Sequence, residues 1–97
     1  MAKQSVKCAN IIDGDTFDTD TGIRIILARV NAPPIITKRG QEAKKLLESL
    51  IFQKLITYET VARDTYGRQV AEVWIDSSNV NDVMVDVGQK LQSHYQP

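Results

Sequence analysis

The sequence has one cysteine, few aromatic residues and no excess of either charge. Cys8 is the single cysteine among 97 residues, so an internal disulfide is excluded. Because Cys8 alternates with apolar neighbours, we expect a buried small hydrophobe rather than a reactive thiol. Twelve Lys and Arg residues balance twelve Asp and Glu residues. This balance argues against avid, sequence-independent binding of nucleic acid, although it leaves room for a local basic patch.

Long apolar runs are also missing. No stretch of the sequence is long enough to span a membrane, and the first residues lack the apolar run of a secretory signal. These absences predict a cytoplasmic protein without membrane association, with a trimmed secreted domain as the alternative. Apolar residues still make up 42% of the chain, which is ordinary for a folded globule. The length predicts a single domain over residues 1–97 with one modest core.

Apolar periodicity and turn residues divide the chain into short elements. Five strands are expected where apolar or β-branched residues cluster, at residues 5–12, 16–20, 23–30, 54–61 and 69–76. The clearest helix is expected at 41–51, whose apolar residues form one stripe, with Gly40 as its N-cap. A second helix is expected from Val80 and should end at Gly88. This order of elements is typical of an α+β fold, the five-stranded Greek-key barrel of the OB type.

Two short motifs place polar groups at turns. The segment Asp13-Gly14-Asp15-Thr16 follows the first strand, and Asp side chains at turns commonly bond to their own backbone. Because Asp13 and Asp15 are two apart on an extended chain, one can face a pocket while the other closes the turn. Further along, Arg68 ends the segment Asp64-Thr65-Tyr66-Gly67-Arg68. It could grip a phosphate or form a surface ion pair with Asp64. Taken alone, neither motif is specific enough to indicate a function.

Taken together, the motifs and their spacing resemble the staphylococcal nuclease (thermonuclease-like) family. The matching segments are Ile12 to Thr16, Arg29 to Pro33, Gly40 to Ala43, Arg63 to Ala71, Val80-Asn81 and Val87-Gly88. The family's third, C-terminal helix has no counterpart in this sequence. The resemblance implies an OB barrel that cleaves DNA or RNA with one Ca²⁺, held by two aspartates and a backbone carbonyl. It also implies a glutamate that activates water and two arginines that bind the phosphate.

Several catalytic positions implied by this resemblance have changed chemical type. Asp15 matches the first metal-binding aspartate, and Arg68 matches the second arginine. The changed positions are Asn31 for the second aspartate, Pro34 for the glutamate and Ile26 for the first arginine. The resemblance thus predicts a degenerate active site in which Pro34 and Ile26 mark lost groups.

Each change removes a group that the reaction needs. Asn31 offers an amide oxygen in place of a carboxylate, with the backbone of Ala32 beside it, so Ca²⁺ is expected to bind weakly. Pro34 cannot take a proton, and losing a general base typically costs roughly 10²–10⁴ in rate. Of two nearby arginines that could substitute for the missing donor, Arg24 is expected to face solvent, and the role of Arg29 is left open.

These features favour a thermonuclease-like domain with lost or crippled catalysis that binds nucleic acid with modest affinity. Candidate contacts are the basic and aromatic residues Lys38, Arg39, Lys44, Lys45, Arg63, Arg68, Tyr66 and Tyr95. Trp74 is expected in the core or barrel wall rather than on a stacking surface. Two alternatives stay open: an active metal-dependent DNA or RNA nuclease, and a protein–protein interaction domain that docks a partner or a second copy.

Overall fold

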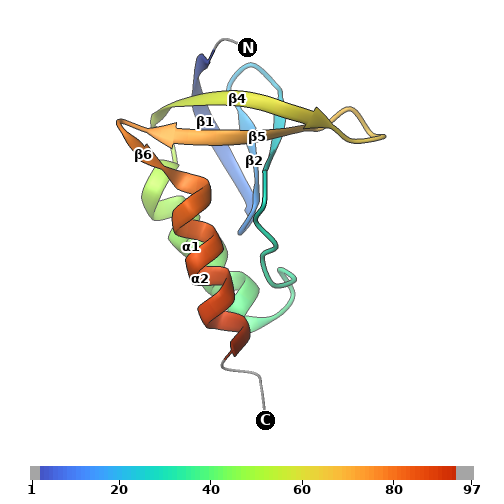
Figure 1. Cartoon of the computed structure of the whole chain (residues 1–97), viewed down its shortest axis with the longest axis vertical. Helices are drawn as coiled ribbons and strands as arrows, with labels where there is room; N and C mark the ends of the chain where they lie inside the picture. Colours follow the sequence, from blue (N-terminus) through green and yellow to red (C-terminus); the bar gives the residue numbers. More distant parts are fainter. Residues whose placement is uncertain (1–2, 94–97) are drawn as a thin grey trace.

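The computed structural model describes the backbone of residues 3–93 and the side chains of residues 3–86. Its elements, in chain order, are β1 (Gln4–Asp13), β2 (Thr16–Thr19), β3 (Arg24–Leu27), α1 (Lys38–Ile51), β4 (Leu55–Arg63), β5 (Gln69–Ile75), β6 (Ser78–Asn79) and α2 (Val80–Ser93). The strands lie together in the upper part of the molecule, and the two helices lie against each other below them (Figure 1).

The strands close into a barrel. Along the sheet they run β3-β2-β1-β4-β5-β6, and a further parallel pairing joins β3 to β5. This pairing closes the ring β1-β2-β3-β5-β4. All the remaining neighbouring pairs in the ring are antiparallel. The result is the five-stranded OB-type barrel that the element order predicted. The two-residue strand β6 was not predicted, and it extends the sheet beyond β5.

The core fills the barrel and the space between the barrel and α1. The predicted helical stripe is confirmed, since Ala43, Leu47 and Ile51 are buried against the barrel. Cys8 on β1 is fully buried, as expected, and burial raises the pKa of its thiol. Trp74 on β5 is half-buried and lies outside this core. Its ring lies under the ammonium of Lys3, 4.0 Å from the ring centroid, which agrees with a place in the barrel wall.

Both helices differ from the prediction at one end. The N-cap of α1 is Thr37, whose hydroxyl oxygen accepts a hydrogen bond from the Gly40 amide at 3.0 Å. The assignment of Gly40 as N-cap was therefore wrong. This glycine is buried in the first turn, and a Cβ there would come within 1.9 Å of the Pro34 carbonyl oxygen. In α2 the helix continues past Gly88 to Ser93, so Gly88 does not end it.

Within the described part of the chain, neither helix is long and apolar enough to cross a lipid bilayer.

Candidate functional site

The turn between β1 and β2 holds the carboxylate that the sequence singled out. Asp13 closes this turn, because its Oδ1 accepts a hydrogen bond from the Asp15 amide at 3.0 Å. Asp15 points instead toward the loop after β3. Its Oδ1 accepts a hydrogen bond from the Thr16 hydroxyl at 3.0 Å, and its Oδ2 accepts one from the Ala32 amide at 3.3 Å. The two aspartates thus divide the roles as predicted, and Asp15 meets the segment that contains Asn31.

Close packing keeps this turn and the loop together. Gly14 is buried, and a Cβ at this position would lie 2.6 Å from the Cβ of Ala43 on α1 and 2.8 Å from the Cβ of Ala32. Real Cβ contacts are not this short. Only glycine at position 14 therefore allows the turn to come this close to Ala43 and Ala32. The Asp15 backbone is also held, since its carbonyl oxygen accepts a hydrogen bond from the Leu27 amide at 2.7 Å. The position of the Asp15 carboxylate is therefore set by three separate segments.

The environment of Asp15 favours its protonated form. Burial is the main cause, and the neighbouring carboxyl of Asp13 adds to it, so that the pKa of Asp15 rises to about 6. Hydrogen bonds from Ala32 and Thr16 lower the pKa, but by less than the other effects raise it. A cation or a cationic side chain near this carboxylate would favour its charged form. The residues that hydrogen-bond the Asp15 carboxylate, Thr16 and Ala32, supply no such charge.

The oxygen donors around Asp15 do not fit a tight Ca²⁺ site. Ca²⁺ takes about six to eight oxygen ligands, several of them carboxylates in high-affinity sites. Among the residues with described side chains, no three Asp, Glu, His or Cys groups gather closely enough to hold a metal. Asp13 and Asp15 supply two carboxylates, and both oxygens of Asp15 already accept hydrogen bonds from the protein.

Strand pairing brings two other candidate positions to the same region. Ile26 on β3 pairs with Thr16, the neighbour of Asp15, and on its other side with Val70 on β5. Arg68 comes immediately before β5, two residues from Val70. The pairing therefore brings Ile26 between the strand that follows Asp15 and the strand that follows Arg68, although the positions are far apart in the sequence. Ile26 is half-buried there and offers no donor to a phosphate.

Arg68 is engaged by an acid of its own hairpin. Its Nε pairs with Oδ2 of Asp64, and the other Asp64 oxygen accepts the amides of Tyr66 at 3.0 Å and Arg68 at 2.9 Å. Of the two alternatives from the sequence, this structure shows the ion pair. The Arg68 side chain remains 40% exposed, and its guanidinium carbon lies 5.6 Å from the centroid of the Tyr66 ring. The Tyr66 residue is 83% exposed at the hairpin tip, where a planar ligand can reach it.

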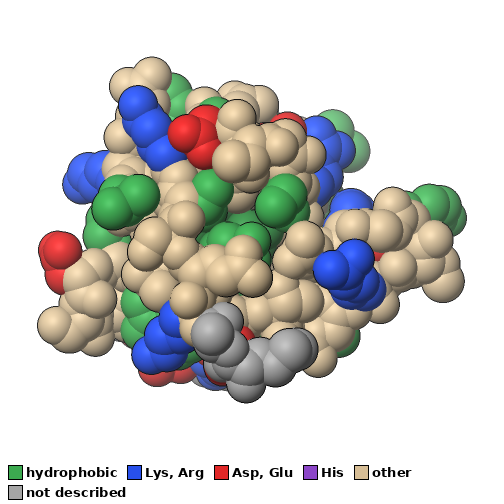
Figure 2. Space-filling model, turned by 90° about the horizontal axis from the view of Figure 1, so that it is seen from above, with side chains coloured by type: hydrophobic (Ala, Val, Ile, Leu, Met, Phe, Trp, Pro, Cys, Tyr) green, Lys and Arg blue, Asp and Glu red, His purple; other side chains and the backbone are tan. Residues whose placement is uncertain are grey.

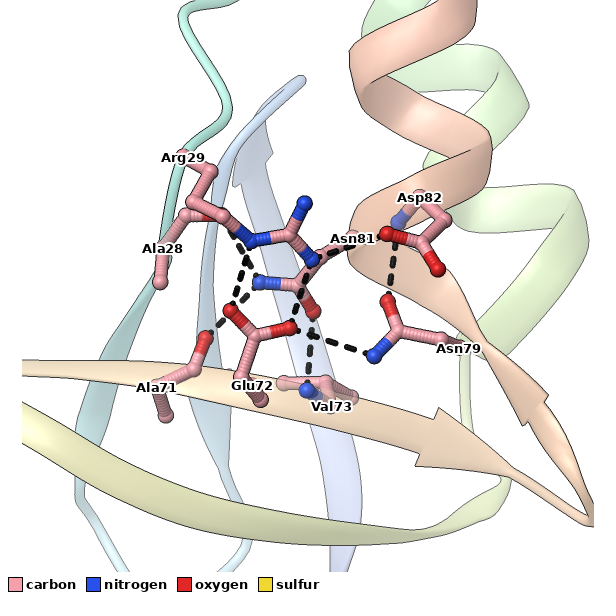
Figure 3. Close-up of polar contacts among 8 residues, drawn as sticks. All are labelled: Ala28, Arg29, Ala71, Glu72, Val73, Asn79, Asn81 and Asp82. Atoms are coloured by element: carbon pink, nitrogen blue, oxygen red, sulfur yellow. Dashed lines mark hydrogen bonds and ion pairs between the residues drawn. The ribbon is translucent and has the colours of Figure 1, made fainter.

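The two other arginines considered in the sequence, Arg24 and Arg29, both form ion pairs. Arg24 forms two hydrogen bonds with Asp18, at 2.7 and 3.0 Å, on the exposed side of the sheet, as expected. Arg29, which the sequence left open, is structural. It binds both carboxylate oxygens of Glu72, at 2.9 and 2.7 Å, and Oδ1 of Asp82 at 2.9 Å (Figure 3). These contacts join the end of β3 to β5 and α2.

The loop after β3 ends at the start of α1. Asn31 and Pro34 are both exposed, and Pro34 has no side-chain acceptor. Its backbone carbonyl oxygen accepts hydrogen bonds from the Thr37 amide at 3.0 Å and the Thr37 hydroxyl at 2.6 Å. Pro34 therefore braces the helix start and supplies no base near Asp15.

Asn81, whose role was not predicted from the sequence, is fully buried at the start of α2. Its Oδ1 accepts a hydrogen bond from the Val73 amide at 2.8 Å. Its Nδ2 donates to the carbonyl oxygens of Ala28 and Ala71, both at 2.9 Å (Figure 3). The side chain thus satisfies three backbone groups from two separate segments. In the sequence, only its place in the Val80-Asn81 segment singled it out.

The predicted basic residues do not form one dense patch. Arg63 is exposed at the end of β4, near Tyr66 and Arg68, while Lys38 and Lys45 are exposed on α1. In the face seen in Figure 2, Lys and Arg side chains lie around the edge, with Asp and Glu side chains among them and hydrophobic side chains in the middle. This distribution agrees with the zero net charge. Tyr95 lies outside the described residues.

Comparisons with known proteins relate this chain to nuclease homologues. The family profile described as "Staphylococcal nuclease homologue" matches residues 24–96. A Haemophilus influenzae protein named as an uncharacterized endonuclease is 33% identical over 90 residues, which cover 89% of this chain and 51% of that protein. A protein of the same name from Escherichia coli O157:H7 is 33% identical over 86 residues, covering 84% and 56%.

Protein ParB of Escherichia coli is 30% identical over 90 residues, covering 80% of this chain and 51% of that protein. The chain thus spans about half the length of the curated relatives it matches. The profile match covers most of the barrel and both helices, so this chain belongs to the staphylococcal nuclease homologue family.

Proposed function

We propose that this chain is a nuclease-type OB domain that binds nucleic acid and has lost most of its hydrolytic activity. The observation that supports this most directly is the surroundings of Asp15. Its carboxylate meets the backbone amide of Ala32, and the neighbouring positions carry Asn31, Pro34 and Ile26 rather than charged groups. A phosphodiester transition state gains most from fixed positive charges and donors at the reacting oxygens. Here the first arginine, the second carboxylate and the general base are all replaced.

Binding of nucleic acid is supported by the tip of the β4–β5 hairpin. Tyr66 exposes its ring, and Arg68 and Arg63 lie on either side of it in the sequence. OB barrels hold single strands by base stacking on aromatic rings and by cationic contacts to phosphates. Because the net charge is zero and Arg68 is paired with Asp64, we expect modest affinity and strong dependence on salt.

A restored variant tests the loss of catalysis. Plasmid DNA and a single-stranded RNA are incubated with the wild-type chain and with Ile26→Arg, Asn31→Asp, Pro34→Glu, in Ca²⁺, Mg²⁺ or Mn²⁺. We expect cleavage by the triple variant only, and its loss on adding Asp15→Ala. Circular dichroism shows whether each variant keeps the fold. Cleavage by the wild-type chain at a rate comparable to that of the folded triple variant would contradict the proposal.

An active metal-dependent phosphodiesterase is the second candidate. It is favoured by relatives that are named endonucleases, and by the adjacent carboxyls of Asp13 and Asp15. Under this candidate, the wild-type chain cleaves with a divalent cation, and both Asp15→Ala and Arg68→Ala abolish cleavage.

Calorimetry with Ca²⁺ provides a separate measurement. We expect weak binding by the wild-type chain and binding tighter by about tenfold or more in Asn31→Asp, since affinity follows the number of charged ligands.

A further inference from the structure

The loop between β3 and α1 presents an apolar side chain to solvent. Ile36 is 89% exposed, more than any other large hydrophobic residue among those with described side chains. Single exposed hydrophobic residues are common on protein surfaces and need no special explanation. This one lies in the same loop as Ala32, which contacts Asp15, and immediately precedes Thr37, the N-cap of α1.

The loop holds Ile36 in a fixed place. On its N-terminal side, two successive prolines restrict the backbone. On its C-terminal side, the Thr37 amide and hydroxyl both donate to the Pro34 carbonyl oxygen, at 3.0 and 2.6 Å. Gly40 packs so closely on Pro34 that no side chain fits between them. These contacts brace the backbone on both sides of Ile36, so the side chain is presented without a mobile loop.

The neighbours of Ile36 suggest what it contacts. Four residues before Ile36 in the same loop, the Ala32 amide donates to the Asp15 carboxylate, so the loop passes the candidate site. Lys38 follows two residues after Ile36 and is exposed in the first turn of α1. An apolar tip beside an exposed cation suits a polyanion with apolar faces between its charged groups. Nucleic acid has this chemistry, and several DNA-binding proteins insert Ile, Leu or Phe between adjacent bases.

We propose that Ile36 inserts between two adjacent bases of a bound DNA strand while Lys38 contacts a flanking phosphate. This inference rests on the proposed function, because it requires the domain to bind nucleic acid. Inserting the side chain separates two stacked bases, and burial of the isoleucine between them offsets part of that cost. A braced loop favours insertion, since little conformational freedom of the protein is lost on binding.

Aminopurine, an adenine analogue whose fluorescence is quenched by stacking, provides the test. The full chain is titrated into single-stranded and duplex oligonucleotides that carry aminopurine at successive positions, and anisotropy of a terminal dye measures binding separately. We expect fluorescence at one position to rise on binding of the wild-type chain and of Ile36→Leu. Ile36→Ser should lose this rise, with affinity lowered by no more than about tenfold. Whichever oligonucleotide shows the rise identifies single-stranded or duplex DNA as the ligand.

Two control variants separate this role from general effects. Leu55→Ser removes another exposed aliphatic side chain, 69% exposed at the start of β4, and should keep the fluorescence rise. Lys38→Ala should weaken binding and keep the rise at saturation. Binding without a fluorescence rise that depends on Ile36 overturns the insertion and leaves the proposed function standing. Absence of binding by anisotropy overturns both. Loss of a dimer in Ile36→Ser, with unchanged aminopurine fluorescence, would assign Ile36 to self-association instead.

Discussion

The amide nitrogen of Ala32 lies 3.3 Å from Oδ2 of Asp15, and this contact joins the loop after β3 to the turn between β1 and β2. It turns the Asp15 carboxylate toward the segment that carries Asn31 and Pro34. The same contact uses an oxygen that a cation would otherwise approach. Under the proposed function, Asn31 and Pro34 flank the segment that meets Asp15, so a small set of substitutions tests these positions together.

Asp15→Asn should stabilise the protein at neutral and higher pH. The pKa of Asp15 rises to about 6 from its ordinary 3.8, so the folded state binds the proton more tightly than the unfolded state. The free energy of unfolding therefore falls as pH rises from 3.8 to about 6. Above that range, the charged Asp15 carboxylate exerts its full destabilising effect on the folded state. Asn carries no charge and avoids this cost. After allowing for partial solvent screening, we expect a gain of about 1 kcal/mol.

Urea unfolding of the wild-type chain and Asp15→Asn, at about pH 8 and about pH 4, measures this effect. The difference between the two proteins should shrink at the lower pH, where Asp15 is protonated in the folded state. A destabilisation of equal size at both pH values would show that the Asp15 hydrogen bonds matter more than its charge.

Asn81→Ala should be strongly destabilising. The substitution leaves three backbone groups, the Val73 amide and the carbonyls of Ala28 and Ala71, without their buried partner. Each unsatisfied group costs about 1–3 kcal/mol, so we expect a total of roughly 3–5 kcal/mol. Asn79→Ala is the control, since Asn79 is only partly buried, and it should cost about 1 kcal/mol as a lost helix cap. Similar losses in the two variants, measured by chemical unfolding, would contradict the central role of Asn81.

Gly40→Ala should destabilise the protein, although alanine usually stabilises a helix relative to glycine. A Cβ at this position would lie 1.9 Å from the Pro34 carbonyl oxygen, so α1 and the loop must separate. Such overpacking typically costs about 1–3 kcal/mol. Gln41→Ala, at the exposed neighbouring position, should change the melting temperature little. If Gly40→Ala raises the melting temperature as an ordinary helix substitution does, the tight contact with Pro34 is wrong.

Asp64→Asn should strengthen binding to single-stranded DNA. The change removes the carboxylate that pairs with Arg68 and leaves an amide oxygen to accept the turn amides. With the guanidinium released, one more phosphate contact is expected, so the slope of log affinity against log salt should steepen by roughly one. Adding Arg68→Ala to Asp64→Asn should return the slope to the wild-type value. Anisotropy titrations at several salt concentrations measure both, and equal slopes in all three proteins would exclude Arg68 from the binding surface.

The elements of this fold were predictable because their signals are local. Apolar residues at helical spacing placed Ala43, Leu47 and Ile51 on the buried face of α1. Turn residues separated the five strands of the barrel, and the expected order was observed. The division of roles between Asp13 and Asp15 was also predicted, since it follows from side-chain alternation on an extended chain. The family resemblance suggested the site positions, and strand pairing places Ile26 beside Thr16, the neighbour of Asp15, and beside Val70, two residues from Arg68.

By itself the sequence determined the kinds of elements, the buried stripe and the chemical type of each site residue, because these depend on neighbours a few positions away. Only the tertiary structure decided which partners the polar groups found. Gly40 allows a backbone approach to Pro34, Arg29 joins Glu72 to Asp82, and Asn81 satisfies three backbone groups. Each of these contacts depends on segments that come together only when β3 pairs with β5 and the barrel closes. The spacing of residues within one segment does not indicate which distant segment it will contact.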